Sequence, residues 1–172
     1  MKRAEILDAV WQAQDMAFEL MTEYDALPHY YGSIVLFQAE AYIVNQIGHT
    51  PGITTTELSV RLGKTSSACS QIIKKLIDKG IVVQNRNAKN RRIYNLELTE
   101  IGEKVYQDHI LFNAECQKNT FSRLSNFTDE ELLTALRVQQ RINETYMDDV
   151  SSSKKRFSKE DSTDTIVETE IE

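Results

Sequence analysis

Apolar residues recur at helical spacing towards both ends of the chain, and this pattern predicts long amphipathic helices. The first is expected over residues 5–25, and it should end before Pro28, which cannot continue a helix. A second helix is predicted over residues 33–47. Two more are expected over residues 99–121 and residues 128–150. Their apolar stripes need covering, and a symmetric partner is the common solution, so we expect a dimer.

Shorter elements lie between these helices, and their end signals indicate a helix-turn-helix. Thr54 and Glu57 have the spacing of a capping box, in which two residues bond each other's backbone amides at a helix start. Gly63 fits the left-handed position that ends such a helix. After a short turn, a second helix is predicted to run to Lys79, where Gly80 stops it.

A hairpin with a charged tip is predicted next. Residues 81–86 and 93–98 are rich in strand-forming side chains, whereas residues 87–92 between them are polar and basic. The sequence therefore predicts a mainly α fold, in which a winged helix-turn-helix domain with a small β-hairpin wing is flanked by N- and C-terminal dimerisation helices. Apolar residues become sparse after Val150, so residues 151–172 are expected to form a flexible tail.

The distribution of charge changes the picture that composition gives. The chain of 172 residues has 20 basic and 26 acidic side chains, a net charge of −6, which argues weakly against binding to nucleic acid. Residues 54–106, however, hold ten basic and five acidic side chains, while the segments on either side are net negative. A basic middle predicts one module that meets a polyanion. Two cysteines and no run of about 18 apolar residues favour a reducing cytoplasm and no membrane span.

The second helix of the motif has two different faces. Cys69, Ile73 and Leu76 fall on an apolar face, and small, polar and basic residues fall opposite, as a helix in the major groove requires. The residues expected to contact bases are Ser66, Ser67, Ser70, Gln71 and Lys74. Further contacts to DNA, mainly to phosphates, are expected from Thr55, Lys75, Arg86, Lys89, Asn90, Arg91 and Arg92.

These residues also carry a resemblance. The pattern consists of Thr55-Thr56-Glu57-Leu58, Arg61-Leu62-Gly63, Ser67, Ser70, Ile73, Leu76, Lys79-Gly80, Asn90-Arg91-Arg92 and Leu98-Thr99-Glu100-Ile101-Gly102. In this pattern, and in the order of elements over residues 5–150, the chain resembles the MarR family of bacterial transcription regulators. The resemblance implies that residues 1–50 and 99–150 supply dimerisation helices and that residues 53–98 form the winged helix-turn-helix.

The resemblance further implies a cytoplasmic homodimer that binds double-stranded DNA at a palindromic operator. It implies a repressor that responds to a small-molecule effector, bound where the dimerisation and DNA-binding parts meet. Asn90 departs from the pattern, because the family usually has an acidic residue before the arginine pair of the wing. Residues 151–172 lie outside the family pattern.

A metal-responsive branch of the same family provides an alternative. The places that hold its ligands correspond here to Glu23, His29, Glu40, Asp108 and His109. Nitrogen and carboxylate ligands would suit zinc or a similar divalent ion. Ala41 and Asn113 stand where that branch has further histidines, so the sequence assigns no metal site and no cofactor.

Other sensing chemistries receive only weak support. Peroxide-sensing members use a cysteine near the first helix, where this chain has none; Cys69 is expected in the core, and Cys116 in the core or an interface. An aromatic cluster near the first two helices could line an effector pocket or the dimer core; it comprises Tyr24, Tyr30, Tyr31, Phe37 and Tyr42.

Two other classes of function compete with DNA binding. No phosphate-binding glycine loop, zinc-protease motif or nucleophile elbow is present, so the chain is not expected to be an enzyme and no catalytic residue is assigned. The better rival is a winged helix that binds a protein and never contacts DNA. That alternative predicts that the basic residues of the wing can be neutralised without loss of function.

Overall fold

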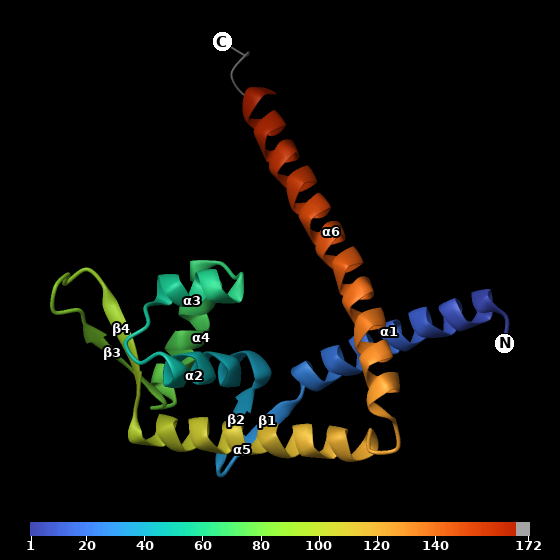
Figure 1. The fold of residues 1–172 in the computed structure, drawn as a ribbon. Coiled ribbons are helices and arrows are strands. Elements are labelled where there is room, and N and C mark those ends of the chain that lie inside the picture. Colours follow the sequence, from blue (N-terminus) through green and yellow to red (C-terminus); the bar gives the residue numbers. More distant parts are fainter. Residues whose placement is uncertain (168–172) are drawn as a thin grey trace. The chain divides into compact units, whose positions relative to one another are not determined.

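The structure is a computed structural model that describes residues 1–167, with side chains described for residues 1–157. Its elements are α1 (Arg3–Ala26), β1 (Pro28–Tyr31), β2 (Ile34–Phe37), α2 (Gln38–His49), α3 (Thr55–Leu62), α4 (Ser66–Asp78), β3 (Val82–Arg86), β4 (Tyr94–Leu98), α5 (Glu100–Arg123) and α6 (Asp129–Val167) (Figure 1). The chain divides into two compact units, Met1–Gln117 and Lys118–Glu172. Among the described residues, no helix has both the length and the hydropathy needed to cross a membrane.

The hydrophobic core of the first unit lies among α2, α3, α4 and the strands beside them. Its completely buried large side chains are Leu36, Ile43, Ile47, Leu58, Ile73, Leu76, Ile81 and Leu96. Burying one such side chain contributes roughly 1.5–3 kcal/mol, so this set supplies the main favourable contribution to the stability of the domain. The periodic apolar positions of the two short helices face this core, which holds the helix-turn-helix together.

Capping residues fix the ends of the two short helices as the sequence predicts. The Thr54 hydroxyl accepts the Glu57 amide at 3.2 Å, and the Glu57 carboxylate accepts the Thr54 amide at 2.8 Å. Gly63 ends α3 at φ +58°, a conformation that costs glycine little because it has no Cβ. The Thr65 hydroxyl accepts the Ala68 amide at 3.2 Å and starts α4. The predicted capping box and the two helix ends are therefore confirmed.

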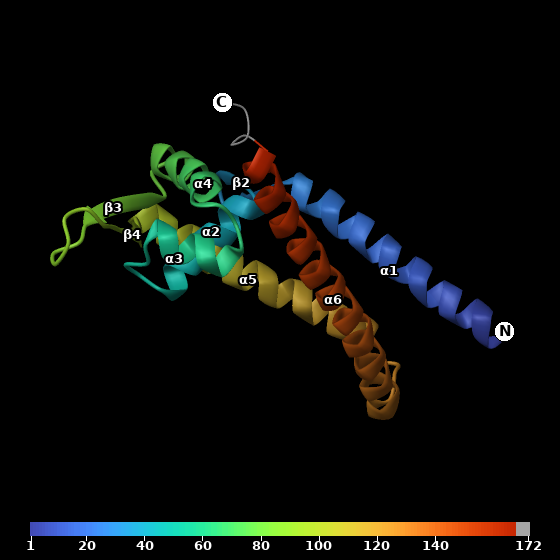
Figure 2. The ribbon, with the colours of Figure 1, turned by 90° about the horizontal axis from the view of Figure 1, so that it is seen from above.

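The predicted wing is confirmed as the antiparallel pair β3–β4, in register from Val82 opposite Leu98 to Arg86 opposite Tyr94. Buried Leu96 anchors β4 to the core. Figures 1 and 2 show that the loop of this hairpin projects away from α3 and α4. The strands of the wing are thus anchored in the core, and its basic loop extends from them.

A second hairpin corrects the prediction of a helix over residues 33–47. In the structure, β1 pairs with β2 in register from Pro28 opposite Phe37 to Tyr31 opposite Ile34, and α2 begins only at Gln38. Gly32 adopts φ +58° in the two-residue turn between the strands. The run of aromatic and β-branched residues around this glycine favours a hairpin, although the spacing of its apolar residues also fits a helix.

The last helix is longer than predicted. Thr128 and Glu131 form the expected capping box, with the Thr128 amide 2.8 Å from the Glu131 carboxylate. The helix does not end near Val150, however, because α6 continues to Val167. The predicted end of this helix is therefore wrong, and residues 151–167 contain no proline or glycine to stop it. The flexibility expected of residues 151–172 stays a prediction. Residues 168–172 lie outside the described residues.

Candidate nucleic-acid interface

The helix α4 presents the two faces that its sequence predicts. Cys69, Ile73 and Leu76 are buried beneath it. Every residue of α4 that was expected to contact DNA is exposed, namely Ser66, Ser67, Ser70, Gln71, Lys74 and Lys75. Because these side chains share the outer face of one helix, they can enter a groove together. Their contact with bases or phosphates remains a prediction.

Hydrogen bonds distinguish the serines of this face. The Ser66 hydroxyl lies 3.3 Å from the Ser59 hydroxyl of α3, and the Ser70 hydroxyl donates to the Ser66 carbonyl at 2.7 Å. Ser66 therefore shares its hydroxyl with the packing of α3 on α4. Ser67 and Gln71 are exposed on the same face and are better placed to bond base edges.

Thr55 lies half-buried in the first turn of α3, where backbone amides lack helical partners. The neighbouring Glu57 carboxylate accepts hydrogen bonds from the Thr54 amide and hydroxyl. These hydrogen bonds lower the pKa of Glu57. A permanent negative charge at this end of α3 would oppose a nearby phosphate. Thr55 is consequently a weaker phosphate candidate than the exposed cations of α4 and of the wing.

The wing tip is shaped by asparagine side chains and leaves its cations outside. The Asn87 carboxamide oxygen accepts the amides of Lys89 and Asn90 at 2.9 and 3.1 Å, and the Asn90 oxygen accepts the Arg92 amide at 3.1 Å. Asn90 thus braces the turn with a neutral oxygen where the family usually has a carboxylate. The exposed cations of the wing are Arg86, Lys89, Arg91 and Arg92. Their charges converge on the projecting hairpin, as contact with a phosphate backbone requires.

The metal-ligand candidates do not assemble into a site. No group of three or more His, Cys, Asp or Glu residues among those described could hold a metal ion. The two ring nitrogens of His109 lie 3.0 Å from the Tyr31 hydroxyl and 3.0 Å from the Asn113 amide. Glu40 is paired with Lys79, and Nε2 of His29 lies 3.2 Å from the Tyr24 carbonyl. Glu23 and Asp108 therefore have no cluster to complete.

Burial perturbs the titration of this polar cluster. It lowers the pKa of His109, and the nearby His29 adds to this effect. It also raises the pKa of Tyr31 to about 12. Both groups are thus neutral near pH 7 and form an uncharged hydrogen-bonded pair between β1 and α5. The cluster fixes the β1–β2 hairpin on α5.

The residues of the predicted aromatic cluster differ in their burial. Tyr31 is buried against His109, whereas Tyr30 and Phe37 are exposed. Only Tyr42 of the cluster lines a cavity of about 470 Å³, whose other lining residues are Met21, Asp25, Gln38, Ala39, Ile43, Arg61, Leu62, Lys64 and Ile72. Arg61 and Lys64 give this cavity two cations, and Asp25 gives it one carboxylate. Cys69 is buried as predicted, and Cys116 is exposed on α5.

Comparison with known proteins places this geometry among transcription regulators. Residues 37–93 match the profile of the MarR family. The HTH-type transcriptional regulator BilQ of Clostridium symbiosum is 28% identical over 107 residues, or 62% of this chain and 74% of BilQ. The zinc-responsive MarR family member ZitR of Lactococcus lactis superimposes with a TM-score of 0.71 at 15% identity, over 82% of this chain and 99% of ZitR. FabT of Streptococcus pneumoniae, solved in complex with DNA, gives 0.64 at 17% identity, over 84% and 98%.

Proposed function

We propose that this chain, whose residues 37–93 match the profile of the MarR family, is a repressor that binds a palindromic operator in double-stranded DNA as a homodimer. The observation that carries the proposal is the exposed polar face of α4 beside a basic, projecting wing. A helix in the major groove and a cationic hairpin on the backbone are complementary ways to hold a duplex. Regulation in the cytoplasm, without catalysis, follows from this proposal.

The long helices support the homodimer. None of the residues of α1 is buried, although the helix carries Trp11, Phe18 and Leu20. The side chains described for α6 are likewise unburied, and they include Leu133 and Leu136. Apolar surface of this extent is characteristic of an interface, and a second copy offers the same stripes in a symmetric arrangement. Two winged helices would then meet two half-sites.

We propose the cavity of about 470 Å³ as the place of a small-molecule effector. Its walls include side chains of α1 and of both helices of the helix-turn-helix, so an occupant would contact a dimerisation helix and the DNA-binding motif together. Two cations, Arg61 and Lys64, outnumber the one carboxylate of the lining, Asp25, and this balance favours an anionic compound. No metal is required by this proposal, and the metal-responsive alternative receives no support from the described side chains.

The test is selection of genomic fragments by the purified full-length protein at near-physiological salt. Recovery of fragments that share an inverted repeat would support the proposal. On the recovered duplex, Arg91→Ala should weaken binding to all sequences and lower the salt slope by about one, whereas Gln71→Ala should change the preference among sequences.

Arg141→Ala is the matched control, because it removes the same charge from an exposed arginine outside the winged helix. Unchanged affinity and salt slope in Arg91→Ala would refute the role of the wing. Recovery of only random DNA that dissociates at modest salt would favour the rival, a winged helix that binds a protein.

A further inference from the structure

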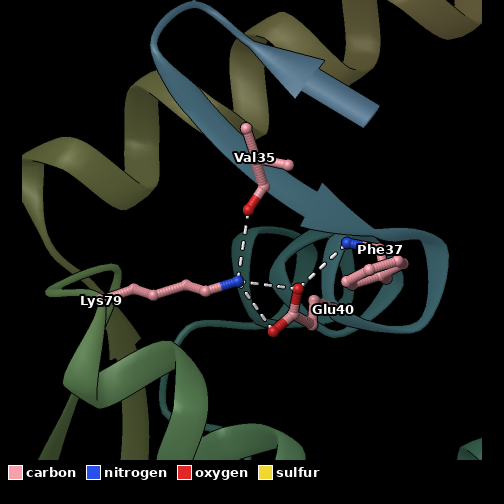
Figure 3. Close-up of polar contacts among 4 residues, drawn as sticks. All are labelled: Val35, Phe37, Glu40 and Lys79. Atoms are coloured by element: carbon pink, nitrogen blue, oxygen red, sulfur yellow. Dashed lines mark hydrogen bonds and ion pairs between the residues drawn. The ribbon is translucent and has the colours of Figure 1, made fainter. Parts of the chain in front are cut away.

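An ion pair joins the end of the recognition helix α4 to the start of α2 (Figure 3). Lys79, the residue that caps the C-terminus of α4, places its Nζ 2.9 Å from each carboxylate oxygen of Glu40 and 3.2 Å from the Val35 carbonyl. One oxygen of Glu40 also accepts the Phe37 amide at 3.0 Å. Four polar contacts therefore converge on one short connection between β2, α2 and α4.

The Glu40 carboxylate is buried, with 7% of its side chain exposed, while the Lys79 side chain is 36% exposed. A buried carboxylate is costly unless its oxygens are paired, and a buried ion pair seldom adds stability relative to apolar residues of similar volume. Its effect here is directional, because Nζ faces both carboxylate oxygens and a fixed carbonyl. The other ion pairs recorded among the described side chains, Lys104–Glu100 and Arg141–Glu144, each lie within a single helix.

The position of the ion pair indicates that it controls the orientation of α4. The remaining support of α4 comes mainly from buried apolar side chains, such as Ile73 and Leu76, which resist separation but are weakly directional. Lys79 fixes the end of this helix against Glu40, and the β1–β2 hairpin leads from Glu40 back to α1. The pair thus links the DNA-contacting helix to the segment that follows a proposed dimerisation helix.

We propose that Glu40 and Lys79 are positioning residues that set the orientation of α4, so that discrimination between operator and other DNA depends on them without their contacting bases. This inference rests on the proposed function. A positioning role and a purely electrostatic role predict opposite changes in operator affinity when Glu40 is replaced. Glu40→Gln removes a negative charge, which by itself would strengthen binding to any DNA. Loss of orientation instead weakens binding to the operator and leaves binding to other DNA unchanged or stronger.

The experiment compares the affinities of full-length variants for two duplexes: the inverted repeat recovered by genomic selection, and a shuffled duplex of equal length and composition. The variants are Glu40→Gln, Lys79→Met, which keeps the aliphatic stem, and the double variant. Each single variant should lower the ratio of specific to non-specific affinity by about tenfold, which lies within the range for coupled contacts. The double variant should lose no more than the singles, because the two residues act as one pair.

Glu100→Gln is the matched control, since it removes the same charge from an exposed pair that lies within one helix. Circular dichroism and thermal melting establish that each variant is folded. The double variant tests the inference even if Lys79→Met unfolds, because it leaves no unpaired buried carboxylate.

A ratio equal to that of wild type in the folded Glu40→Gln and double variants would overturn the inference. So would a Lys79→Met variant that weakens both duplexes equally and lowers the salt slope, because Lys79 would then be a phosphate contact. If the wild-type protein itself selects no sequence, the proposed function fails, and the inference fails with it. This outcome differs from an unchanged affinity ratio in the variants, which would overturn the inference alone.

Discussion

The winged-helix segment and the two long helices use the same kind of apolar pattern in opposite ways. In the winged helix, Leu58, Leu76 and Leu96 are completely buried within one copy of the chain. In the long helices, Trp11 of α1 and Leu136 of α6 remain more than half exposed. An amphipathic pattern states that a face needs covering, but it does not say what covers it. The first region finds its partner within the chain, and the second is expected to find it in another copy.

The largest expected effect is on the free energy of unfolding, when a leucine is replaced by alanine in the winged helix and, for comparison, in α6. Leu76→Ala should lower the free energy of unfolding by about 2–5 kcal/mol, because it opens a cavity in the core of the winged helix. Urea denaturation followed by circular dichroism measures the change, and the change should not depend on protein concentration. Leu136→Ala is the matched substitution in α6. An equal, concentration-independent loss for both variants would contradict the comparison.

A charge placed on the exposed face of α6 should weaken dimerisation without unfolding the winged helix. Leu136→Asp is expected to raise the dimer dissociation constant by roughly 30-fold or more, as for a buried interface residue costing about 2 kcal/mol. Analytical ultracentrifugation over a concentration series measures this constant. The winged helix should stay folded, with an unchanged near-ultraviolet spectrum. A variant with the mass distribution of wild type would show that this face of α6 is not part of the interface.

The two capping boxes allow a smaller and closely matched test. Thr54→Ala and Thr128→Ala each remove the hydroxyl that accepts a helix amide, and each should cost about 1 kcal/mol. Thr54→Ala should lower the stability of the winged helix itself. Thr128→Ala should act on α6, and its cost should shrink at low protein concentration if α6 is stabilised by dimerisation. Urea midpoints at two concentrations distinguish these outcomes.

The pH dependence of the winged-helix unit should be the smallest effect. Burial and the nearby His29 lower the pKa of His109 in the folded state, so the unfolded chain binds this proton more readily. Stability from this group is therefore complete above the ordinary histidine pKa near 6.5 and is lost as the pH falls below it. The urea midpoint should decrease between pH 7.5 and 5.5. The decrease should be smaller in His109→Gln, and an equal decrease would assign it to other groups.

Most of the local structure could be predicted from the sequence. The capping boxes at Thr54 and Thr128 were identified because their bonds span three residues, and such short-range signals are visible in sequence. The wing was found for the same reason. The β1–β2 hairpin cannot be told from a helix by its pattern, because a short apolar run fits a helix and a strand equally well, and its turn depends on the positive φ of Gly32. The extension of α6 past Val150 does not follow from the sequence pattern, because apolar residues at helical spacing become sparse there.

The candidate interface was predicted in composition but not in detail. The exposed face of α4 and the cations of the wing follow directly from periodicity and charge. The sequence could not show that Ser66 shares its hydroxyl with Ser59, or that Asn90 braces the wing turn. It also placed Glu40 among metal-ligand candidates, whereas the structure pairs that carboxylate with Lys79.

By itself, the sequence determined the helix ends, the two faces of α4, the basic wing and the need of the long helices for a partner. These features depend on residues within a few positions of each other or on a simple period. Only the tertiary structure decided that Glu40 meets Lys79, 39 residues away, and that Tyr31 meets His109, 78 residues away. Such contacts depend on how buried elements pack, because a side chain's partner across the core is set by the path of the whole chain and not by its neighbours in sequence.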